Sequence, residues 1–205
     1  HAQEIIVPGD ISSAAYFIAA ALMVPDSEIL IKNVGINPTR DGLLRVCQDM
    51  GADITLLNEN YGNGEPTADL LVRHSELHGM TVGGSVIPTL IDELPVVAAL
   101  ACFARGTTVI RDAQELKVKE SNRIDVMVNN LRAMGAHIEG TDDGMIIEGG
   151  YPLHGAIIDS HLDHRIAMTF AITALASDGE TSIKGADCVK ISYPRFYEDL
   201  TRLAK

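Results

Sequence analysis

Two short runs of charged residues could bind an anionic ligand and move a proton. One run spans residues 117–123 and includes Lys119, Glu120 and Arg123, and the other spans residues 161–165. Both runs stand at predicted helix starts, where free backbone N–H groups and the helix dipole favour negative charge. Cations crowded there cost stability by themselves, and an anion that binds them reverses this cost. The pattern therefore predicts local anion binding.

Each run also allows a simpler interpretation. The first could be a basic edge paired with Glu115 and Glu120, and the second could be a capped helix start with an exposed Arg165. A metal site built on His161 and His164 is disfavoured, because no third ligand has a suitable spacing.

An internal repeat relates the positions of these runs. Three segments, residues 9–15, 91–97 and 162–168, each place an Asp just before a small, apolar helix of about three turns. A β-branched strand follows each helix, and a second helix with a capping residue begins 29 residues after the Asp. These capping residues are Thr39, Ser121 and Ser192. Three equal spacings indicate three copies of one unit.

The repeat predicts one α/β domain, of the α+β type, over residues 1–205. The second helices of copies one and two run to Gly51 and Gly135, which suit left-handed caps, and a hairpin follows each one. The three βαβαββ repeats are expected over residues 3–75, 78–150 and 155–205. Copy three lacks its closing hairpin, and His1 is an unusual start. We therefore expect the chain to be part of a longer protein that covers this edge.

Equivalent helix starts in pseudo-symmetric copies should point toward one region. Copy one, with Ser12, Ser13 and Arg40, is expected to be mainly structural. Asp92 alone could be only a helix cap, but beside the cations it becomes a candidate for proton transfer. The predicted shared surface holds Asp92, Lys119, Glu120, Arg123, His164 and Arg165. Cations that bind an anion, with carboxylates beside them, suit proton transfer on a phosphorylated or carboxylated substrate.

The composition argues against several classes of protein. The formal net charge of −12 disfavours nucleic acid as a partner, and no apolar run reaches the roughly 18 residues of a membrane span. Cys47, Cys102 and Cys188 are widely spaced within apolar patterns and match no metal site. We therefore expect a cytoplasmic protein with reduced thiols that binds neither nucleic acid nor a membrane.

Several motifs carry a resemblance to a known family. Residues 118–123, 162–168 and 192–194 resemble the C-terminal half of the EPSP synthase family of enolpyruvyl transferases. Residues 9–15 and the Asp92 segment match in order and spacing, so the resemblance covers essentially the whole chain. The Asn-Pro-Thr-Arg run that ends at Arg40 is more similar to the class II and Gram-positive bacterial branch. The family implies two domains, each of three βαβαββ units, with the active site in the cleft between them.

The resemblance implies a transferase of the shikimate pathway, which leads to the aromatic amino acids. It moves the enolpyruvyl group of phosphoenolpyruvate to the 5-hydroxyl of shikimate 3-phosphate and releases phosphate, through a tetrahedral intermediate and without a metal or organic cofactor. Glyphosate, which inhibits the family at the phosphoenolpyruvate pocket, is a candidate ligand. Such domains usually borrow a segment from the extreme N-terminus of the protein, which would account for the incomplete third copy. Because half the site is absent, we expect the isolated chain to be inactive.

The same resemblance implies roles for the charged residues. Asp92 contacts the reacting 5-hydroxyl as base or acid, and Glu120 exchanges the proton at the methylene carbon of phosphoenolpyruvate. The remaining residues bind substrate: Lys119 between the two substrates, Arg123 and Arg165 on the carboxylate of phosphoenolpyruvate, and His164 in support of them.

The chain departs from the family pattern at a few positions. Asn122 stands where the family often has Asp, and Ile191 stands where many members have a Lys near the transferred phosphate. Lys190, one place earlier, is a possible substitute. Two other functions stay open at this point. One is UDP-N-acetylglucosamine enolpyruvyl transferase, whose motifs fit residues 119–123 poorly, and the other is a non-catalytic module that binds a phosphorylated ligand.

Overall fold

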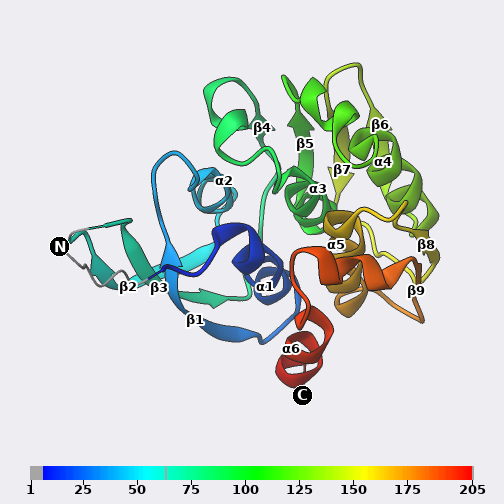
Figure 1. Ribbon diagram of the computed structural model, residues 1–205. Coiled ribbons are helices and arrows are strands. Elements are labelled where there is room, and N and C mark those ends of the chain that lie inside the picture. Colours follow the sequence, from blue (N-terminus) through cyan, green and yellow to red (C-terminus); the bar gives the residue numbers. More distant parts are fainter. Residues whose placement is uncertain (1–6, 63, 205) are drawn as a thin grey trace.

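The computed structural model describes residues 7–62 and 64–204, in which helices and strands alternate along the chain (Figure 1). The first part comprises α1 (Ile11–Met23), β1 (Glu28–Gly35), α2 (Gly42–Asp49), β2 (Asp53–Asn60) and β3 (Thr67–Arg73). The middle part comprises β4 (Thr81–Val82), η1 (Gly84–Thr89), α3 (Leu94–Phe103), β5 (Gly106–Ile110), η2 (Gln114–Val118), α4 (Arg123–Ala133), β6 (His137–Gly140) and β7 (Met145–Gly149). The last part comprises β8 (Ile157–Asp159), α5 (His164–Leu175), β9 (Ser182–Lys184), η3 (Ala186–Ile191) and α6 (Phe196–Leu203).

The strands form three separate small sheets. The first has the order β1-β3-β2 and is antiparallel, and the second has the order β4-β5-β7-β6. In the second sheet β4 runs parallel to β5, whereas β5, β7 and β6 are antiparallel. The third sheet has only β8 and β9, which are parallel. A strand, a helix and a parallel strand thus recur in the middle and last parts, as in a βαβ unit.

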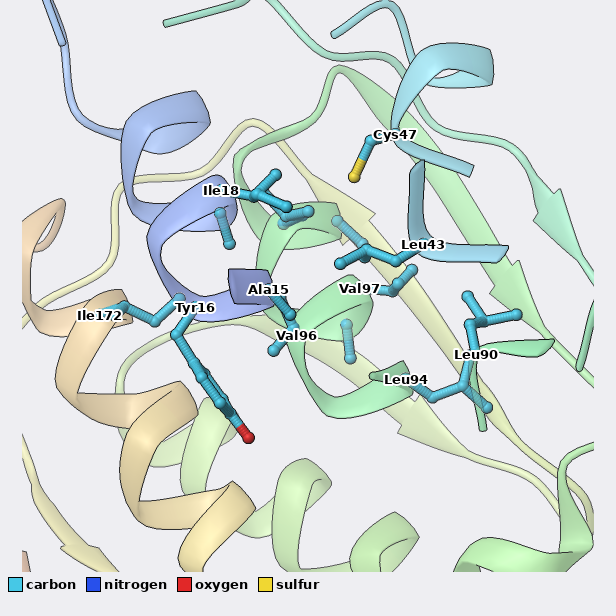
Figure 2. Close-up of a cluster of buried hydrophobic side chains, with 14 of the residues drawn as sticks. Ala15, Tyr16, Ile18, Leu43, Cys47, Leu90, Leu94, Val96, Val97 and Ile172 are labelled. Carbon is cyan, nitrogen blue, oxygen red and sulfur yellow. The ribbon is translucent and has the colours of Figure 1, made fainter. Parts of the chain in front are cut away.

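Three apolar helices form the centre of the molecule. Helices α1, α3 and α5 pack against one another, and the sheets lie around them (Figure 1). In α3 every residue from Leu94 to Cys102 is buried, because its alanines and valines let neighbouring helices approach from all sides. Figure 2 shows Ile18 of α1, Val97 of α3 and Leu43 of α2 meeting in this core. Small aliphatic residues therefore fill most of this core, together with a few aromatic residues such as Tyr16 and Phe170.

Two of the three central helices have the expected aspartate caps. Asp10 accepts a hydrogen bond from Ser13 N at 2.9 Å, and Asp163 accepts one from Arg165 N at 3.0 Å. At α3 the prediction was wrong. Glu93 occupies the cap position without a side-chain bond to the helix, and Asp92 lies in the turn before it. The side chain of Asp92 is therefore free to face other charged groups instead of the helix end.

The predicted caps of the second helices, Thr39, Ser121 and Ser192, were also wrong, because α2, α4 and α6 begin later. Asn37 accepts hydrogen bonds from the backbone N–H and the hydroxyl of Thr39 and holds it in a turn. Asn122 caps α4 by accepting from Asp125 N at 3.3 Å. Pro194 restricts Tyr193 before it, so α6 starts only at Phe196.

The predicted strands and hairpins agree with the structure. The β-branched strands predicted after the first helix of each copy are β1, β5 and β9, and the hairpins predicted in copies one and two are β2–β3 and β6–β7. The first strand of copy one was placed from residue 3, and residues 3–6 lie outside the described part. Within the described residues, Gly9 forms a parallel β-bridge with Val34 of β1. In the same way, β4 pairs in parallel with β5, and β8 pairs in parallel with β9.

The cysteine expectation also holds in the structure. All three thiols are free, Cys47 and Cys102 are buried, and burial raises the pKa of each of these two to about 12. They are therefore inert core groups at neutral pH.

Within residues 7–62 and 64–204, every helix falls short of the length and apolarity that crossing a bilayer requires.

Two glycines with the same backbone conformation, Gly135 after α4 and Gly106 at the start of β5, make a matched test of crowding around an added side chain. Gly135 and Gly106 have φ of 92° and 90°, but a Cβ at Gly135 would lie 3.1 Å from the His154 ring, whereas at Gly106 it would meet open space. We expect Gly106→Ala to lower the free energy of unfolding by about 1–2 kcal/mol, the cost of left-handed backbone. Gly135→Ala should cost more in the same denaturant titration. Equal losses would show that the His154 ring moves aside freely.

Candidate active site

Asp92 is the meeting point of three cations from different elements. Its Oδ1 lies 3.4 Å from Lys119 Nζ and 3.1 Å from Arg123 Nη1, and its Oδ2 lies 3.4 Å from Arg165 Nη2. Lys119 follows η2, Arg123 begins α4 and Arg165 lies in the first turn of α5. The helix starts of the middle and last parts therefore converge, as the sequence predicted.

Arg123 is buried almost completely, with 1% of its side chain exposed. Its Nε donates to Asp163 Oδ2 at 2.8 Å, its Nη1 donates to Asp92 and its Nη2 donates to Glu120 Oε2 at 2.5 Å. Burial disfavours the charge, but the bond to Asp163 and the other carboxylates outweigh it and raise the pKa of Arg123. The guanidinium is thus a fixed positive charge with a set orientation.

Asp163 joins α4 to α5 and is itself fully buried. It accepts from Ser121 Oγ at 3.0 Å and from the backbone N of Arg165, in addition to Arg123. Burial alone would raise the pKa of Asp163, but the hydrogen bonds and charge of Arg123 outweigh burial and lower it. Asp163 therefore stays ionised and sets the spacing between the two helix starts.

The surroundings shift the pKa values of two neighbouring carboxyl groups, Asp92 and Glu93, in opposite directions. Partial burial opposes ionisation of Asp92, but the charges of Arg165, Lys119 and Arg123 prevail and lower its pKa. Burial dominates at Glu93, whose side chain is 3% exposed, and raises its pKa despite a hydrogen bond from Ser12. Pairs of acids that their surroundings separate in this way are typical of acid–base sites.

Lys119 and Glu120 lie at the more open side of the cluster. Lys119 Nζ lies 2.6 Å from Glu115 Oε1 as well as near Asp92, and Arg123 Nη2 pairs with Glu120. Both pairs of the basic-edge interpretation are therefore present. Burial disfavours the charge of Lys119, but the two carboxylates raise its pKa. The side chain of Glu120 is 52% exposed while Arg123 holds one of its oxygens. An incoming ligand can therefore reach the Glu120 carboxyl directly.

His164 begins α5 and is buried beside these groups. Burial and the charge of Arg165 lower its pKa, and they outweigh Asp163 and Glu120, which act in the other direction. At neutral pH the ring is therefore uncharged, and His164 adds no cation to the cluster.

The described residues contain no group of His, Cys, Asp and Glu that could hold a metal ion.

The structure places Lys190 apart from the other predicted residues. Its Nζ lies 2.6 Å from Asp187 Oδ1 within η3, and its side chain is 66% exposed. The pair joins residues three apart on one short helix, so it orients Lys190 along η3 rather than toward Asp92. Lys190 is therefore not part of the cluster in this arrangement.

The sequence reasoning missed three members of the network. Ser12 donates a hydrogen bond to Glu93 Oε1, and Arg40 Nη2 donates to Ser12 Oγ at 3.0 Å. Glu93 Oε1 in turn lies 3.7 Å from Arg165 Nη1. The first part of the chain thus reaches the cluster through Ser12 and Arg40, and the expectation that copy one is mainly structural stays a prediction. Glu93 beside Asp92 was the one available signal, since a carboxylate in an apolar helix needs a partner.

Two cavities lie apart from this cluster. One of about 480 Å³ lies between α1, β1 and α6 near Phe17 and Leu200, and another of about 270 Å³ lies near Leu77 and Arg105. Neither contains a residue of the charged cluster. The convergence of opposite charges identifies the cluster, and the side chains of Asp92, Lys119 and Glu120 are partly exposed to solvent.

Removing the charge of Asp163 should strongly destabilise the chain. Asp163→Asn keeps a capping side chain but leaves Arg123 buried without its full counter-charge, so we expect the free energy of unfolding to fall by about 3 kcal/mol. Asp10→Asn is the matched control, because Asp10 caps α1 in the same way but is exposed. It should cost less than about 1 kcal/mol. Similar losses from both changes in urea unfolding would contradict the proposed energetics.

The same pair predicts a pH dependence of stability. Because Arg123 lowers the pKa of Asp163, its contribution is complete above the ordinary value of 3.8 and is lost as the pH falls toward the folded-state value. Stability of the wild-type chain should therefore decrease below about pH 4, and Asp163→Asn should flatten this decrease. Unfolding curves recorded at several acidic pH values check the difference in slope.

Comparisons with known proteins agree with this arrangement. The sequence profile described as EPSP synthase (3-phosphoshikimate 1-carboxyvinyltransferase) matches residues 1–200. A 3-phosphoshikimate 1-carboxyvinyltransferase of Thermoanaerobacter sp. (strain X514) is 57% identical over 201 residues, 98% of this chain and 48% of the relative. The corresponding protein of Alkaliphilus oremlandii (strain OhILAs) is 52% identical over 204 residues, 100% of this chain and 48% of the relative.

A solved structure gives the same result for the fold. EPSP synthase from Acinetobacter baumannii superimposes with a TM-score of 0.93 at 42% identity, over 96% of this chain and 46% of that one. The chain thus spans about half the length of the curated relatives that it matches. Matches of this extent and identity establish common descent, and the chain belongs to the EPSP synthase family.

Proposed function

We propose that this chain is the C-terminal half of an enzyme that transfers the enolpyruvyl group of phosphoenolpyruvate to the 5-hydroxyl of shikimate 3-phosphate. The observation that carries the proposal is the contact of Asp92 with Lys119, Arg123 and Arg165, next to the accessible Glu120. Both substrates carry a phosphate and a carboxylate, and converging lysines and arginines suit such groups. Family membership supports the same assignment.

The proton transfers fit two carboxyl groups of the cluster, the half-buried Asp92 and the exposed Glu120. In the addition step, the 5-oxygen bonds to C2 of phosphoenolpyruvate, Asp92 takes the hydroxyl proton and Glu120 gives a proton to the methylene carbon. In the elimination step, Glu120 takes a proton back from that methyl group, the C–O bond to phosphate breaks, and the proton on Asp92 leaves with the phosphate. Both carboxyl groups return to their starting states, as a catalytic cycle requires.

Substrate binding would itself activate Asp92 as a base. With only three cations around it, Asp92 has a lowered pKa and is a weak base. The anionic groups of the substrates neutralise Lys119 and Arg165, so the pKa of Asp92 rises toward the range that favours proton transfer. The low pKa of the unbound carboxylate is thus part of the proposed mechanism.

The same proposal covers the cations and the inhibitor. Arg165 and Arg123 hold the carboxylate of phosphoenolpyruvate, His164 packs behind them as a neutral ring, and Lys119 contacts both substrates. Glyphosate, an anion with carboxylate and phosphonate groups, is a candidate competitor at these cations. Lys190 contacts the transferred phosphate only if it leaves Asp187, so we assign it no role.

The proposal also includes the domain organisation. We infer that residues 3–75, 78–150 and 155–205 are three copies of one βαβαββ unit within one domain. The parallel pairs β4–β5 and β8–β9 and the bridge between Gly9 and Val34 support this relation. The third copy has only two strands among its described residues, so another segment of the full-length protein is expected to complete its sheet.

The proton-transfer role of Glu120 is tested in the full-length protein. We expect Glu120→Gln to lower kcat by about 100-fold or more while both substrates still bind, because one carboxyl group serves both steps. Glu139→Gln is the control, since Glu139 is exposed on β6 and belongs to no part of the cluster. Intact turnover in Glu120→Gln would contradict the proton-transfer role of Glu120. Ligand binding without any turnover in the wild-type full-length protein would favour a non-catalytic module that binds a phosphorylated ligand.

Product analysis with each acceptor tests the substrate assignment. The full-length protein should form 5-enolpyruvylshikimate 3-phosphate and phosphate, with no product from UDP-N-acetylglucosamine. We expect the isolated chain to show no measurable turnover, because half of the substrate contacts and the closure of the cleft are absent. Robust turnover by the isolated chain would contradict the proposal that it is half an active site.

A further inference from the structure

The proposed mechanism gives no role to Glu93, a buried carboxyl group at the centre of the molecule. Its side chain is 3% exposed, and it occupies the cap position of α3 without bonding to the helix. A carboxyl group in such surroundings is costly unless it has partners. Its partners come from α1 and α5, outside its own element.

The contacts of Glu93 form a chain that ends at Arg165. Arg40 Nη2 donates to Ser12 Oγ at 3.0 Å, and the Ser12 hydroxyl donates to Glu93 Oε1. The same Oε1 lies 3.7 Å from Arg165 Nη1, while Arg165 Nη2 lies 3.4 Å from Asp92. Each terminal nitrogen of Arg165 thus faces its own carboxylate.

We propose that Glu93, oriented by Ser12, is a positioning residue that holds Arg165 at the anion site when Asp92 turns to the substrate. The inference rests on the proposed function, because it takes Arg165 as the group that binds the carboxylate of phosphoenolpyruvate. Asp92 cannot take the proton of the 5-hydroxyl and stay the partner of Arg165 at full charge. Glu93 is shielded from substrate and keeps its contact throughout the cycle, so Arg165 retains one fixed counter-charge.

The charged and titratable groups around Glu93 determine how the arrangement responds to pH. They are Arg165 on α5, Asp92 in the same turn, Arg40 before α2 and Tyr16 on α1. Burial raises the pKa of Glu93, and the Ser12 bond and the charge of Arg165 partly counter this. Loss of the Ser12 hydroxyl should therefore raise the pKa of Glu93 further. Glu93 then becomes protonated, and releases Arg165, at a higher pH than in the wild type.

The experiment compares two adjacent serines of α1 in the full-length protein. Ser12→Ala removes the bond to Glu93, whereas Ser13→Ala is the control, because the Ser13 hydroxyl donates to the exposed Asp10 instead. We expect Ser12→Ala to raise KM for phosphoenolpyruvate about tenfold, the value of one hydrogen bond to a charged group, with KM for shikimate 3-phosphate unchanged. Ser13→Ala should change neither constant.

The pH profile separates positioning from a general loss of structure. In Ser12→Ala the acid limb of kcat/KM for phosphoenolpyruvate should move to higher pH. Glu93→Gln keeps the shape of the side chain but not its charge, so it should show the raised KM at every pH. A rise in both KM values, or an unmoved acid limb, would overturn the proposal in favour of a structural role.

A measurement without substrate distinguishes the failure of this inference from the failure of the proposed function. The Nε–H signal of Arg165 in nuclear magnetic resonance spectra should broaden or exchange faster in Ser12→Ala and not in Ser13→Ala. An unchanged signal would overturn the positioning role whatever the activity is. Absence of enolpyruvyl transfer by the wild-type protein, with the signal affected as expected, would refute only the proposed function.

Discussion

The buried pair of Arg123 and Asp163 is the contact on which the rest of the site depends. Arg123 Nε lies 2.8 Å from Asp163 Oδ2, and both side chains are almost fully buried. A buried charge that loses its partner costs several kcal/mol, so α4 and α5 cannot separate without a large penalty. Because Arg123 also donates to Asp92, this pair fixes where the turn before α3 lies relative to the two helices. The geometry of the cluster follows from one desolvated ion pair.

Stability and function make opposite demands on these helix starts. Arg123 and Arg165 stand at N-terminal helix ends, where the dipole disfavours cations. Asp163 and Asp92 offset part of this cost, which explains why carboxylates and cations alternate through the cluster. Anionic substrates would offset it further by taking the place of Asp92. Under the proposed function, a cluster held together by Asp92 is therefore prepared for anions and for proton transfer at once.

The small apolar residues of α1, α3 and α5 make this arrangement possible. Alanines let the three helices pack closely, which brings their first turns together at one end of the core. The same packing encloses Glu93 between α1 and α5, so a carboxyl group from one helix start becomes the partner of Ser12 and Arg165 from two others. A larger residue in these helices would separate the starts and disturb the charges.

The sequence by itself predicted the strands, the central helices and the charged residues that the structure brings together. The spacing of Asp10, Asp92 and Asp163, together with the apolar helices that follow them, predicted which helix starts converge, because local pattern encodes helices, strands and turns. Only the tertiary structure decided which side chains touch. It placed the side chain of Asp92 among three cations instead of on the end of α3, and it kept Lys190 apart from this cluster. It also linked Arg40 through Ser12 to Glu93. Such contacts depend on how segments far apart in the chain pack and on which charges lose their water, and neither is written in local spacing.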